Sequence, residues 1–269
     1  MGEPEAAIFV SGGSSGIGLA VALALARGRA RPRLALFARD APRLDRAAAR
    51  ICAEVPGAEV RCFRLDVSDA EAVARRVAEA VAALGPPDRL VLAAGIALPG
   101  RVDRLGLAAQ RAVMEVNYFG SLNMVLALAP QMPAGAAIAL VGSAAGLIGG
   151  YGYGGYAPSK FALRGLAEVL RVELAPRGIG VTMCLPPDTD TPQLAAERPL
   201  RPAVTARFAA GAPVLSAERV AEALVRGMQA GRFLVLPGLP VKLLYLFGPW
   251  LAPLLRWRQA RLIRRLGED

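Results

Sequence analysis

Tyr156 and Lys160 are the two side chains in this sequence best placed to do acid–base chemistry. They are four residues apart, so on a helix they lie on one face and their polar ends can converge. A nearby ammonium favours the phenolate and lowers the pKa of a tyrosine, which suits it to general acid catalysis. Tyr151 and Tyr153 have no lysine four positions on. We therefore predict Tyr156 as the proton donor, with Ser143, thirteen residues earlier, in the same site.

The composition excludes several other chemistries. The 269 residues contain no histidine, which excludes Ser-His-Asp and Cys-His nucleophile systems and a histidine-ligated zinc. Cys52, Cys62 and Cys184 lack C-x-x-C spacing, so we expect a reducing compartment, no disulfide framework and no metal site. The net charge of +10 comes mainly from arginine, since Lys160 and Lys242 are the only lysines. With aromatic residues at 6%, no nucleic-acid partner is expected.

Short apolar runs of strand length alternate with helical patterns along the chain. The clearest helical pattern recurs every three or four residues from Val73 to Leu84, with Ser68 as the predicted N-cap and Gly85 at the end. This alternation predicts an α/β fold, a single Rossmann-like domain with a doubly wound parallel sheet of about seven strands covered on both faces. The expected strands are Ala6–Val10, Leu34–Ala38, Val60–Leu65, Leu90–Ala94, Ala136–Val141, Val181–Leu185 and Phe233–Leu236.

A glycine-rich turn joins the first expected strand to the first helix between residues 11 and 18. Gly12 lets the turn form, and Gly16 and Gly18 allow a pyrophosphate to approach the amides at the helix N-terminus. The turn therefore predicts a dinucleotide site. Its expected members are Gly12, Ser14, Ser15, Gly16, Ile17 and Gly18.

The end of the second strand indicates which dinucleotide binds. NAD-binding folds of this kind place a carboxylate there, whereas this chain has Ala38 followed by Arg39. A guanidinium suits a 2′-phosphate, and Arg43 can add a second cation, so we predict NADPH. The alternatives are two solvated arginines, or a ribose contact from Asp40.

The spacing Gly-x-x-x-Gly-x-Gly, together with Ser143 and Tyr156-x-x-x-Lys160, resembles the short-chain dehydrogenase/reductase (SDR) family over residues 6–238. The resemblance implies that Tyr156 protonates a carbonyl oxygen which Ser143 polarises. It implies that Lys160 tunes the tyrosine and holds the nicotinamide ribose, and that Asn117 supports a water on the proton path.

Further nucleotide contacts follow from the same resemblance. Asp66 and Val67, after the third strand, match the positions that contact the adenine, although Asp66 could also cap a helix. Ala94 and Gly95 match the passage of the ribose, and Tyr156 and Lys160 complete the cofactor contacts. One position departs from the family, because the asparagine usual just before Ala94-Gly95 is missing. The tie between neighbouring strands is therefore in doubt.

The segment after the sixth strand resembles a particular group within the family. Pro-Pro-Asp-Thr-Asp-Thr-Pro, at 186–192, is similar to the string in 3-ketodihydrosphingosine reductases, as is the segment from Ser159 to Glu168. The resemblance implies that Pro186, Thr189 and Thr191 form a loop over the cofactor. It implies reduction of 3-ketodihydrosphingosine (3-dehydrosphinganine) to dihydrosphingosine in sphingolipid biosynthesis. The alternatives are another lipophilic ketone, 3-oxoacyl or steroid-like, or a non-catalytic cofactor-binding membrane protein.

Residues 239–269 depart from the catalytic domain predicted for 1–238. Their apolar part is interrupted by Pro240, Gly248, Pro249 and Pro253, and an arginine-rich helical pattern follows. The uncharged run 243–255 is shorter than the ~20 residues of a spanning helix. Tryptophans followed by cations predict an interfacial helix over 239–266 on an anionic membrane surface. The alternatives are a helix packed on the domain or a subunit interface.

These features give expectations for location and assembly. The N-terminus carries no apolar run before the first strand, so we expect a cytoplasmic protein, peripheral on the cytoplasmic membrane face. The family resemblance implies a homodimer or homotetramer with a small-molecule ketone as substrate.

Overall fold

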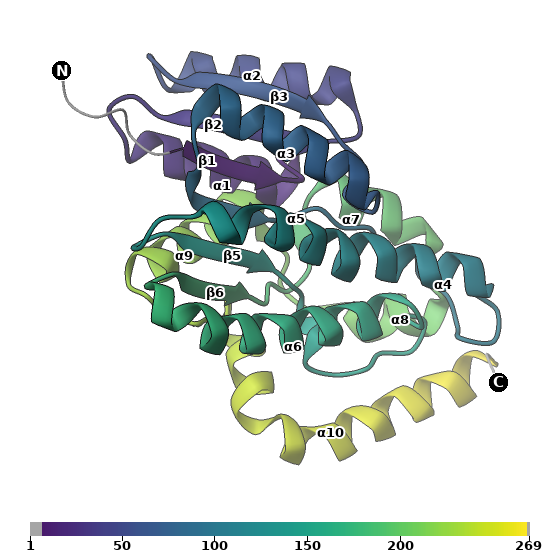
Figure 1. The fold of residues 1–269 in the computed structure, drawn as a ribbon. Helices are drawn as coiled ribbons and strands as arrows, with labels where there is room; N and C mark the ends of the chain where they lie inside the picture. Colours follow the sequence, from purple (N-terminus) through teal and green to yellow (C-terminus); the bar gives the residue numbers. More distant parts are fainter. Residues whose placement is uncertain (1–6, 268–269) are drawn as a thin grey trace.

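The computed structural model describes residues 7–267 and has a seven-stranded parallel sheet at its centre (Figure 1). The strand order β3-β2-β1-β4-β5-β6-β9 is doubly wound and changes direction between β1 and β4. All seven predicted strands are present, with their ends moved by a few residues. They are β1 (Ala7–Ser11), β2 (Arg33–Ala38), β3 (Glu59–Arg64), β4 (Pro87–Leu92), β5 (Ala137–Val141), β6 (Gly180–Cys184) and β9 (Leu234–Val235).

Helices cover both faces of the sheet, and each face has its own apolar core (Figure 1). In β1, Ile8 and Val10 point into one core and Phe9 into the other, and all three are fully buried. Burial on both faces explains why the strands are continuous apolar runs in the sequence. The first face carries α1 (Gly16–Arg27), α2 (Ala41–Glu54) and α9 (Ala217–Gln229), and the second carries α3 (Ala70–Leu84), α5 (Gly120–Leu128) and α6 (Tyr156–Leu174).

The N-cap predicted for α3 is wrong by one residue. Asp69 caps the helix, because its carboxylate accepts a hydrogen bond from Ala72 N at 2.9 Å. The Ser68 hydroxyl instead donates to Asp66 Oδ1 at 2.6 Å. Gly85 ends the helix as predicted, with φ at +73°. Ser68 therefore orients the Asp66 carboxylate rather than the helix.

Between β4 and β5 the chain forms a long helical stretch with a π-helical turn in its middle. The turn, η1 (Glu115–Phe119), contains Asn117 and joins α4 (Leu107–Met114) to α5. Within residues 7–267, Leu107–Gln131 is the helix long and apolar enough to cross a membrane. Met124 is nevertheless fully buried on the sheet, so this stretch contributes to the core.

The segment between β6 and β9 contains short elements that no sequence pattern indicated. β7 (Thr189–Asp190) and β8 (Leu215–Ser216) form a separate two-stranded parallel ladder. Between them lie α7 (Pro192–Glu197), η5 (Arg198–Leu200) and α8 (Ala203–Ala209). Elements this short show no clear periodicity. The remaining 3₁₀ turns are η2 (Ala129–Gln131), η3 (Ala144–Gly146) and η4 (Ala175–Arg177).

The C-terminal helix α10 (Leu239–Leu266) is continuous, which corrects the prediction that prolines interrupt it. Pro249 and Pro253 lie inside the helix, and Figure 1 shows that it bends along its course. Val241 and Gln259 are buried, and Gln259 Oε1 accepts a hydrogen bond from Tyr151 N at 2.8 Å. The helix is therefore anchored on the domain at both ends.

Candidate active site

The carboxyl ends of the strands open into a cavity of about 1150 Å³. It extends from the glycine turn after β1, past Tyr156 at the start of α6, to the inner face of α10. Doubly wound sheets bind their ligands at this edge. Every residue predicted for the site lines this cavity except Asn117.

The glycine turn is shaped to accept a phosphate group. Gly12 has φ at +71°, and a Cβ there would lie 2.6 Å from Ala94 N. A Cβ on Gly18 would lie 2.2 Å from Gly12 O. Within the described chain no side chain caps α1, whose N-cap residue is Ser15, so its first N–H groups stay available to an anion. The turn thus fits the pyrophosphate of a nicotinamide dinucleotide.

Arg39 and Arg43 line the cavity beyond β2, and each forms an ion pair with a nearby carboxylate. Arg39 Nη1 lies 3.9 Å from Asp66 Oδ2, and Arg43 Nε lies 3.2 Å from Asp40 Oδ2. Asp40 also caps α2 by accepting from Arg43 N at 2.9 Å. Burial raises the pKa of Asp66, but hydrogen bonds from Ser68 and the Arg39 charge bring it below its ordinary value. Asp40 therefore serves as a helix cap, and Arg39 and Arg43 each use only part of their guanidinium N–H groups in these ion pairs.

The missing asparagine after β4 does not loosen the sheet. Ala93 N donates to Ser11 O at 3.0 Å, and Gly12 N donates to Phe37 O at 2.8 Å. Backbone hydrogen bonds therefore connect the neighbouring strands at the point where the family's usual asparagine is missing. Ala94 follows directly and lines the cavity beside the glycine turn.

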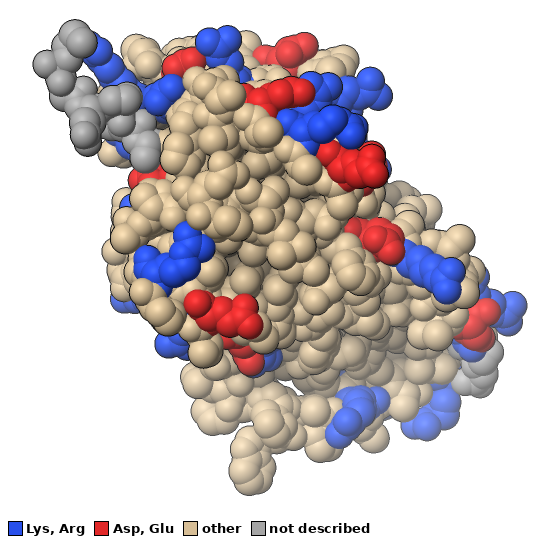
Figure 2. All heavy atoms as spheres, viewed as in Figure 1, with Lys and Arg blue, Asp and Glu red and all other residues tan. Residues whose placement is uncertain are grey.

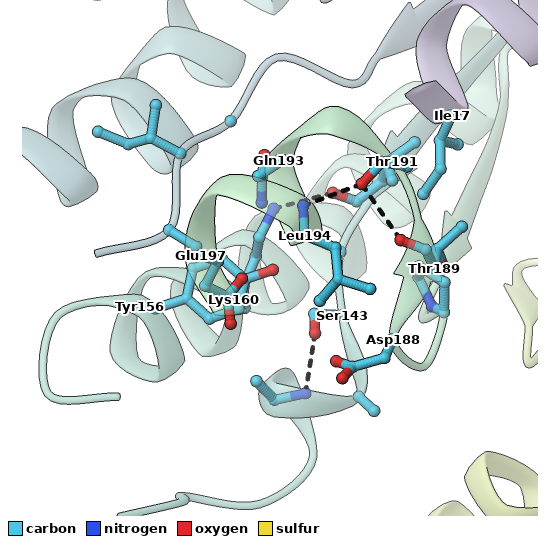
Figure 3. A pocket seen from close by; sticks show the side chains of 18 of the residues that line it. Ile17, Ser143, Tyr156, Lys160, Asp188, Thr189, Thr191, Gln193, Leu194 and Glu197 are labelled. Atoms are coloured by element: carbon cyan, nitrogen blue, oxygen red, sulfur yellow. Dashed lines mark hydrogen bonds between the residues drawn. The ribbon is translucent and has the colours of Figure 1, made fainter. Parts of the chain in front are cut away.

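Tyr156 and Ser143 meet where β5 and α6 approach each other (Figure 3). Ser143 Oγ accepts a hydrogen bond from Ala145 N at 3.1 Å, and the Ser143 hydroxyl lies close enough to Tyr156 to influence the pKa of its phenol. The prediction that Lys160 lowers the pKa of Tyr156 is wrong for the protein alone. Burial raises that pKa to about 12, although the Ser143 hydroxyl acts in the opposite direction.

Lys160 is 5% exposed, and its ammonium lies beside the Tyr156 ring rather than in open solvent. The distance from Nζ to the ring centroid is 5.6 Å, and Nζ donates to Val141 O at 3.1 Å. Burial lowers the pKa of this lysine to about 8. The side chain is therefore largely protonated at neutral pH, at a site where its charge is poorly solvated.

Asn117 is fully buried and joins three segments that border the cavity. Its Nδ2 donates to Ile96 O at 3.0 Å and to Ser159 Oγ at 2.9 Å, and its Oδ1 accepts from Ile96 N at 2.8 Å. Both amide protons are thus used by the protein. The water that the resemblance assigns to Asn117 stays a prediction.

The loop after β6 packs directly on the glycine turn (Figure 3). A Cβ on Gly16 would lie 3.1 Å from Thr191 Cγ2. Thr191 Oγ1 accepts from Leu194 N at 3.2 Å and donates to Thr189 O at 3.2 Å, which fixes the loop at the start of α7. Thr189 and Pro186 line the cavity with it. The structure therefore places this loop against the glycine turn, and its contact with a nucleotide stays a prediction.

A charged network that no sequence motif indicated lies next to Tyr156, and Figure 3 labels two of its members, Asp188 and Glu197. Arg201 holds Asp188 in a bidentate pair, with Nη1 to Oδ2 at 2.7 Å and Nη2 to Oδ1 at 3.0 Å. Its Nε donates to Glu197 Oε1 at 2.8 Å, and the Tyr153 hydroxyl donates to the same oxygen at 2.5 Å. The four-residue spacing of Glu197 and Arg201 was the available signal, but such pairs are common in an arginine-rich chain.

The inner face of α10 forms an apolar wall at the far end of the cavity. The side chains that line it are Val241, Leu243, Leu244, Leu251 and Leu255. The sequence indicated an apolar segment here, but not that one of its faces turns towards Tyr156. The cavity therefore joins a polar catalytic group to a long apolar surface.

A parallel sheet with a dinucleotide turn and a Ser-Tyr-Lys group at its carboxyl edge defines a nicotinamide-dependent oxidoreductase. The profile of the short chain dehydrogenase family matches residues 6–201, and the chain belongs to this family. The predicted fold, enzyme class and cofactor class are confirmed.

Two relatives are similar along most of the chain. A 3-dehydrosphinganine reductase from Danio rerio is 38% identical over 233 residues, 85% of this chain and 70% of the relative. The 3-dehydrosphinganine reductase TSC10B from Arabidopsis thaliana is 37% identical over 85% of this chain and 68% of its own. A solved short chain dehydrogenase/reductase from Burkholderia phymatum, in complex with NAD, is 26% identical with a TM-score of 0.76, covering 95% of this chain and 94% of that one.

Proposed function

We propose that this chain reduces 3-ketodihydrosphingosine to dihydrosphingosine with NADPH. The observation that carries the proposal is one continuous cavity that contains the glycine turn, the Ser143–Tyr156 pair and the apolar wall of α10. To reduce a ketone with a long saturated chain, an enzyme needs a hydride source, then a proton donor beside the carbonyl, and then an apolar channel for the chain, placed in that order along the cavity. The two relatives are named for this substrate, which supports the same reading.

The side chains around Tyr156 have distinct tasks in this reduction. Ser143 Oγ already accepts from Ala145 N, so its proton can be donated to the substrate carbonyl. Tyr156, with a pKa of about 12, is protonated at neutral pH and donates its proton to the same oxygen as the alcohol forms. Lys160 uses one donor at Val141, so its other N–H groups can hold ribose hydroxyls. NADPH, when bound, supplies the hydride.

NADPH is favoured over NADH by the charges beyond β2. Arg39 and Arg43 both line that end of the cavity and can form charge-assisted hydrogen bonds with a 2′-phosphate. Asp40, the carboxylate that could bind ribose hydroxyls instead, is held by the N-terminus of α2 and by Arg43. We therefore propose that the nucleotide site selects the phosphorylated cofactor.

The test is NADPH oxidation by the purified protein in detergent. We would set 3-ketodihydrosphingosine against a panel of 3-oxoacyl and simple ketones. Selective turnover of the sphingoid ketone supports the proposal. Turnover of the other ketones alone would leave the family and the cofactor in place but contradict the substrate. No NADPH oxidation with any ketone would favour a cofactor-binding protein without catalysis.

We also propose that residues 239–266 lie on the cytoplasmic face of a membrane. Leu246, Phe247 and Trp250 are at least half exposed on the outer face of α10, and Trp250 reaches 83%. The helix contains Lys242 and five arginines but no acidic residue. Figure 2 shows basic and uncharged groups along the lower edge of the molecule, where α10 runs. Exposed apolar groups beside cations suit an anionic lipid surface.

Vesicle binding tests this contact with a matched pair of variants. Leu246→Glu places a carboxylate in the proposed contact, whereas Leu107→Glu makes the same change on α4, where the leucine is similarly exposed (63% against 65%). We expect Leu246→Glu to reduce co-sedimentation with anionic vesicles severalfold and Leu107→Glu to have little effect. Equal binding by both variants would contradict the proposal.

We further propose that the chain forms a homo-oligomer through the face of α5 and α6. Leu126, Val169 and Val172 are each at least half exposed on these helices, and Figure 2 shows few charged groups in the middle of this face. Such a patch suits a second copy of the chain. Light scattering on Val172→Glu, which we expect to be monomeric, would test this. An unchanged mass, or a monomeric wild type, would contradict it.

A further inference from the structure

We propose that Glu197 binds a cationic group next to the carbonyl of the substrate, so that the cavity selects an amino ketone over a neutral one. This inference rests on the proposed function and deepens it. 3-Ketodihydrosphingosine carries an amino group, protonated at neutral pH, on the carbon next to the ketone. A group that binds that ammonium must lie beside Tyr156, which receives the ketone oxygen.

The Glu197 side chain is buried yet has an oxygen that faces the cavity. The side chain is 7% exposed, and both of its protein hydrogen bonds, from Arg201 and Tyr153, go to Oε1. Oε2 has no hydrogen-bond partner among residues 7–267. It is also not sealed from solvent, since every fully buried side-chain oxygen or nitrogen of the described residues has a partner. Because Glu197 lines the cavity, Oε2 can accept a hydrogen bond from a ligand there.

The charges around Glu197 favour a cation. Arg201, 6% exposed, is shared between Glu197 and Asp188, so the three side chains together carry one negative charge in excess. Among the described residues Lys160 forms no hydrogen bond or ion pair with this network, and its ammonium donates to Val141 O instead. A buried carboxylate without a full counter-charge is costly, and a ligand ammonium would supply that charge.

The cluster lies at the reacting end of the cavity rather than along the apolar wall. The Tyr153 and Tyr156 rings are 5.6 Å apart, centroid to centroid, and the Tyr153 hydroxyl bonds Glu197. The Glu197 charge also contributes to the raised pKa of Tyr156, which places the carboxylate near the catalytic hydroxyl. Figure 3 shows Glu197 of α7 beside Tyr156 and Lys160 of α6. A carbonyl on Tyr156 therefore brings its neighbouring carbon towards Glu197.

The test compares 3-ketodihydrosphingosine with its analogue that lacks the amino group, as alternative substrates of the full-length protein. We expect the wild type to prefer the amino ketone by about tenfold to a hundredfold in kcat/KM, as for a charge-assisted hydrogen bond. In Glu197→Gln that ratio should fall to near one, and the ratio rather than the absolute rate with either ketone is the readout. A wild-type ratio near one, or an unchanged ratio in Glu197→Gln, would overturn the inference.

Two controls separate charge recognition from folding. Glu222→Gln removes one carboxylate from an exposed pair with Arg226 at the same four-residue spacing, and it should keep the wild-type ratio. Glu197→Asp keeps the charge and should restore part of the preference. If Glu197→Gln does not fold, the two substrates on the wild type still decide the question. Absence of turnover with both ketones would overturn the proposed function and this inference together, whereas equal turnover of both overturns only the inference.

Discussion

Replacing Lys160 with methionine should stabilise the protein while it abolishes catalysis. Lys160 is 5% exposed, and burial lowers its pKa from 10.5 to about 8. At about 1.36 kcal/mol for each pKa unit, keeping this ammonium charged at neutral pH costs roughly 3 kcal/mol of folding free energy. Methionine removes that cost but leaves the Val141 carbonyl without its donor, which offsets about 1 kcal/mol. We expect Lys160→Met to gain about 2 kcal/mol at pH 7.

The pH dependence gives this prediction its sign. The unfolded chain keeps the lysine proton up to about pH 10.5, whereas the folded protein releases it near pH 8. The unfolded state therefore binds more protons between these values, and the Lys160 contribution to stability increases with pH across that window. The advantage of Lys160→Met over the wild type should thus shrink from about 2 kcal/mol at pH 7 towards zero near pH 9.5.

Urea unfolding followed by circular dichroism, without nucleotide, measures both quantities. Lys242→Met is the matched control, since Lys242 is the other lysine of the chain and is exposed on α10. It should change the free energy of unfolding by less than about 0.5 kcal/mol at either pH. A Lys160→Met variant that is less stable at pH 7, or whose advantage does not change with pH, would refute the reasoning.

Three further outcomes follow from the site. Tyr156→Phe should lower kcat at least about a hundredfold and leave NADPH binding intact, as measured by nucleotide fluorescence; unimpaired turnover would rule out this tyrosine as the proton donor. Arg39→Ala should raise the Kd for NADPH about tenfold and leave that for NADH unchanged, whereas an equal loss for both would contradict recognition of the 2′-phosphate. Arg201→Met leaves Asp188 and Glu197 without their shared cation and should cost about 3 kcal/mol in urea unfolding; a loss below about 1 kcal/mol would mean that the network contributes little to the fold.

The sheet and most of the cavity could be predicted from sequence patterns because each of these features depends on residues that are close together in the chain. Strands buried on both faces must be apolar throughout, and the turn at Gly12 needs a residue without a side chain. Tyr156 and Lys160 meet because one helix places them on one face. These constraints act within a few residues, so the sequence alone displays them.

The features that were missed depend on contacts between distant segments or on solvation. Arg201 reaches Asp188 only because the chain folds back after α7, and no local pattern records that return. The pKa of Tyr156 depends on how deeply the phenol is buried, which outweighs the nearby ammonium. Ser68 was predicted to be the N-cap of α3, but its hydroxyl donates to Asp66 instead. The prolines of α10 suggested that the helix would end there. Whether a proline ends a helix or only bends it depends on the contacts around that helix, which the sequence does not show.

The two faces of α10 have a kinetic consequence. Its inner side chains form the wall of the cavity, whereas Leu246 and Trp250 point outward. If the outer face rests in a lipid interface, the aliphatic tail of the substrate can move from bilayer to cavity along one helix without crossing bulk water. Turnover should then follow the mole fraction of ketone within the bilayer, so diluting the substrate with inert phospholipid would slow the enzyme even when the total concentration of ketone is unchanged.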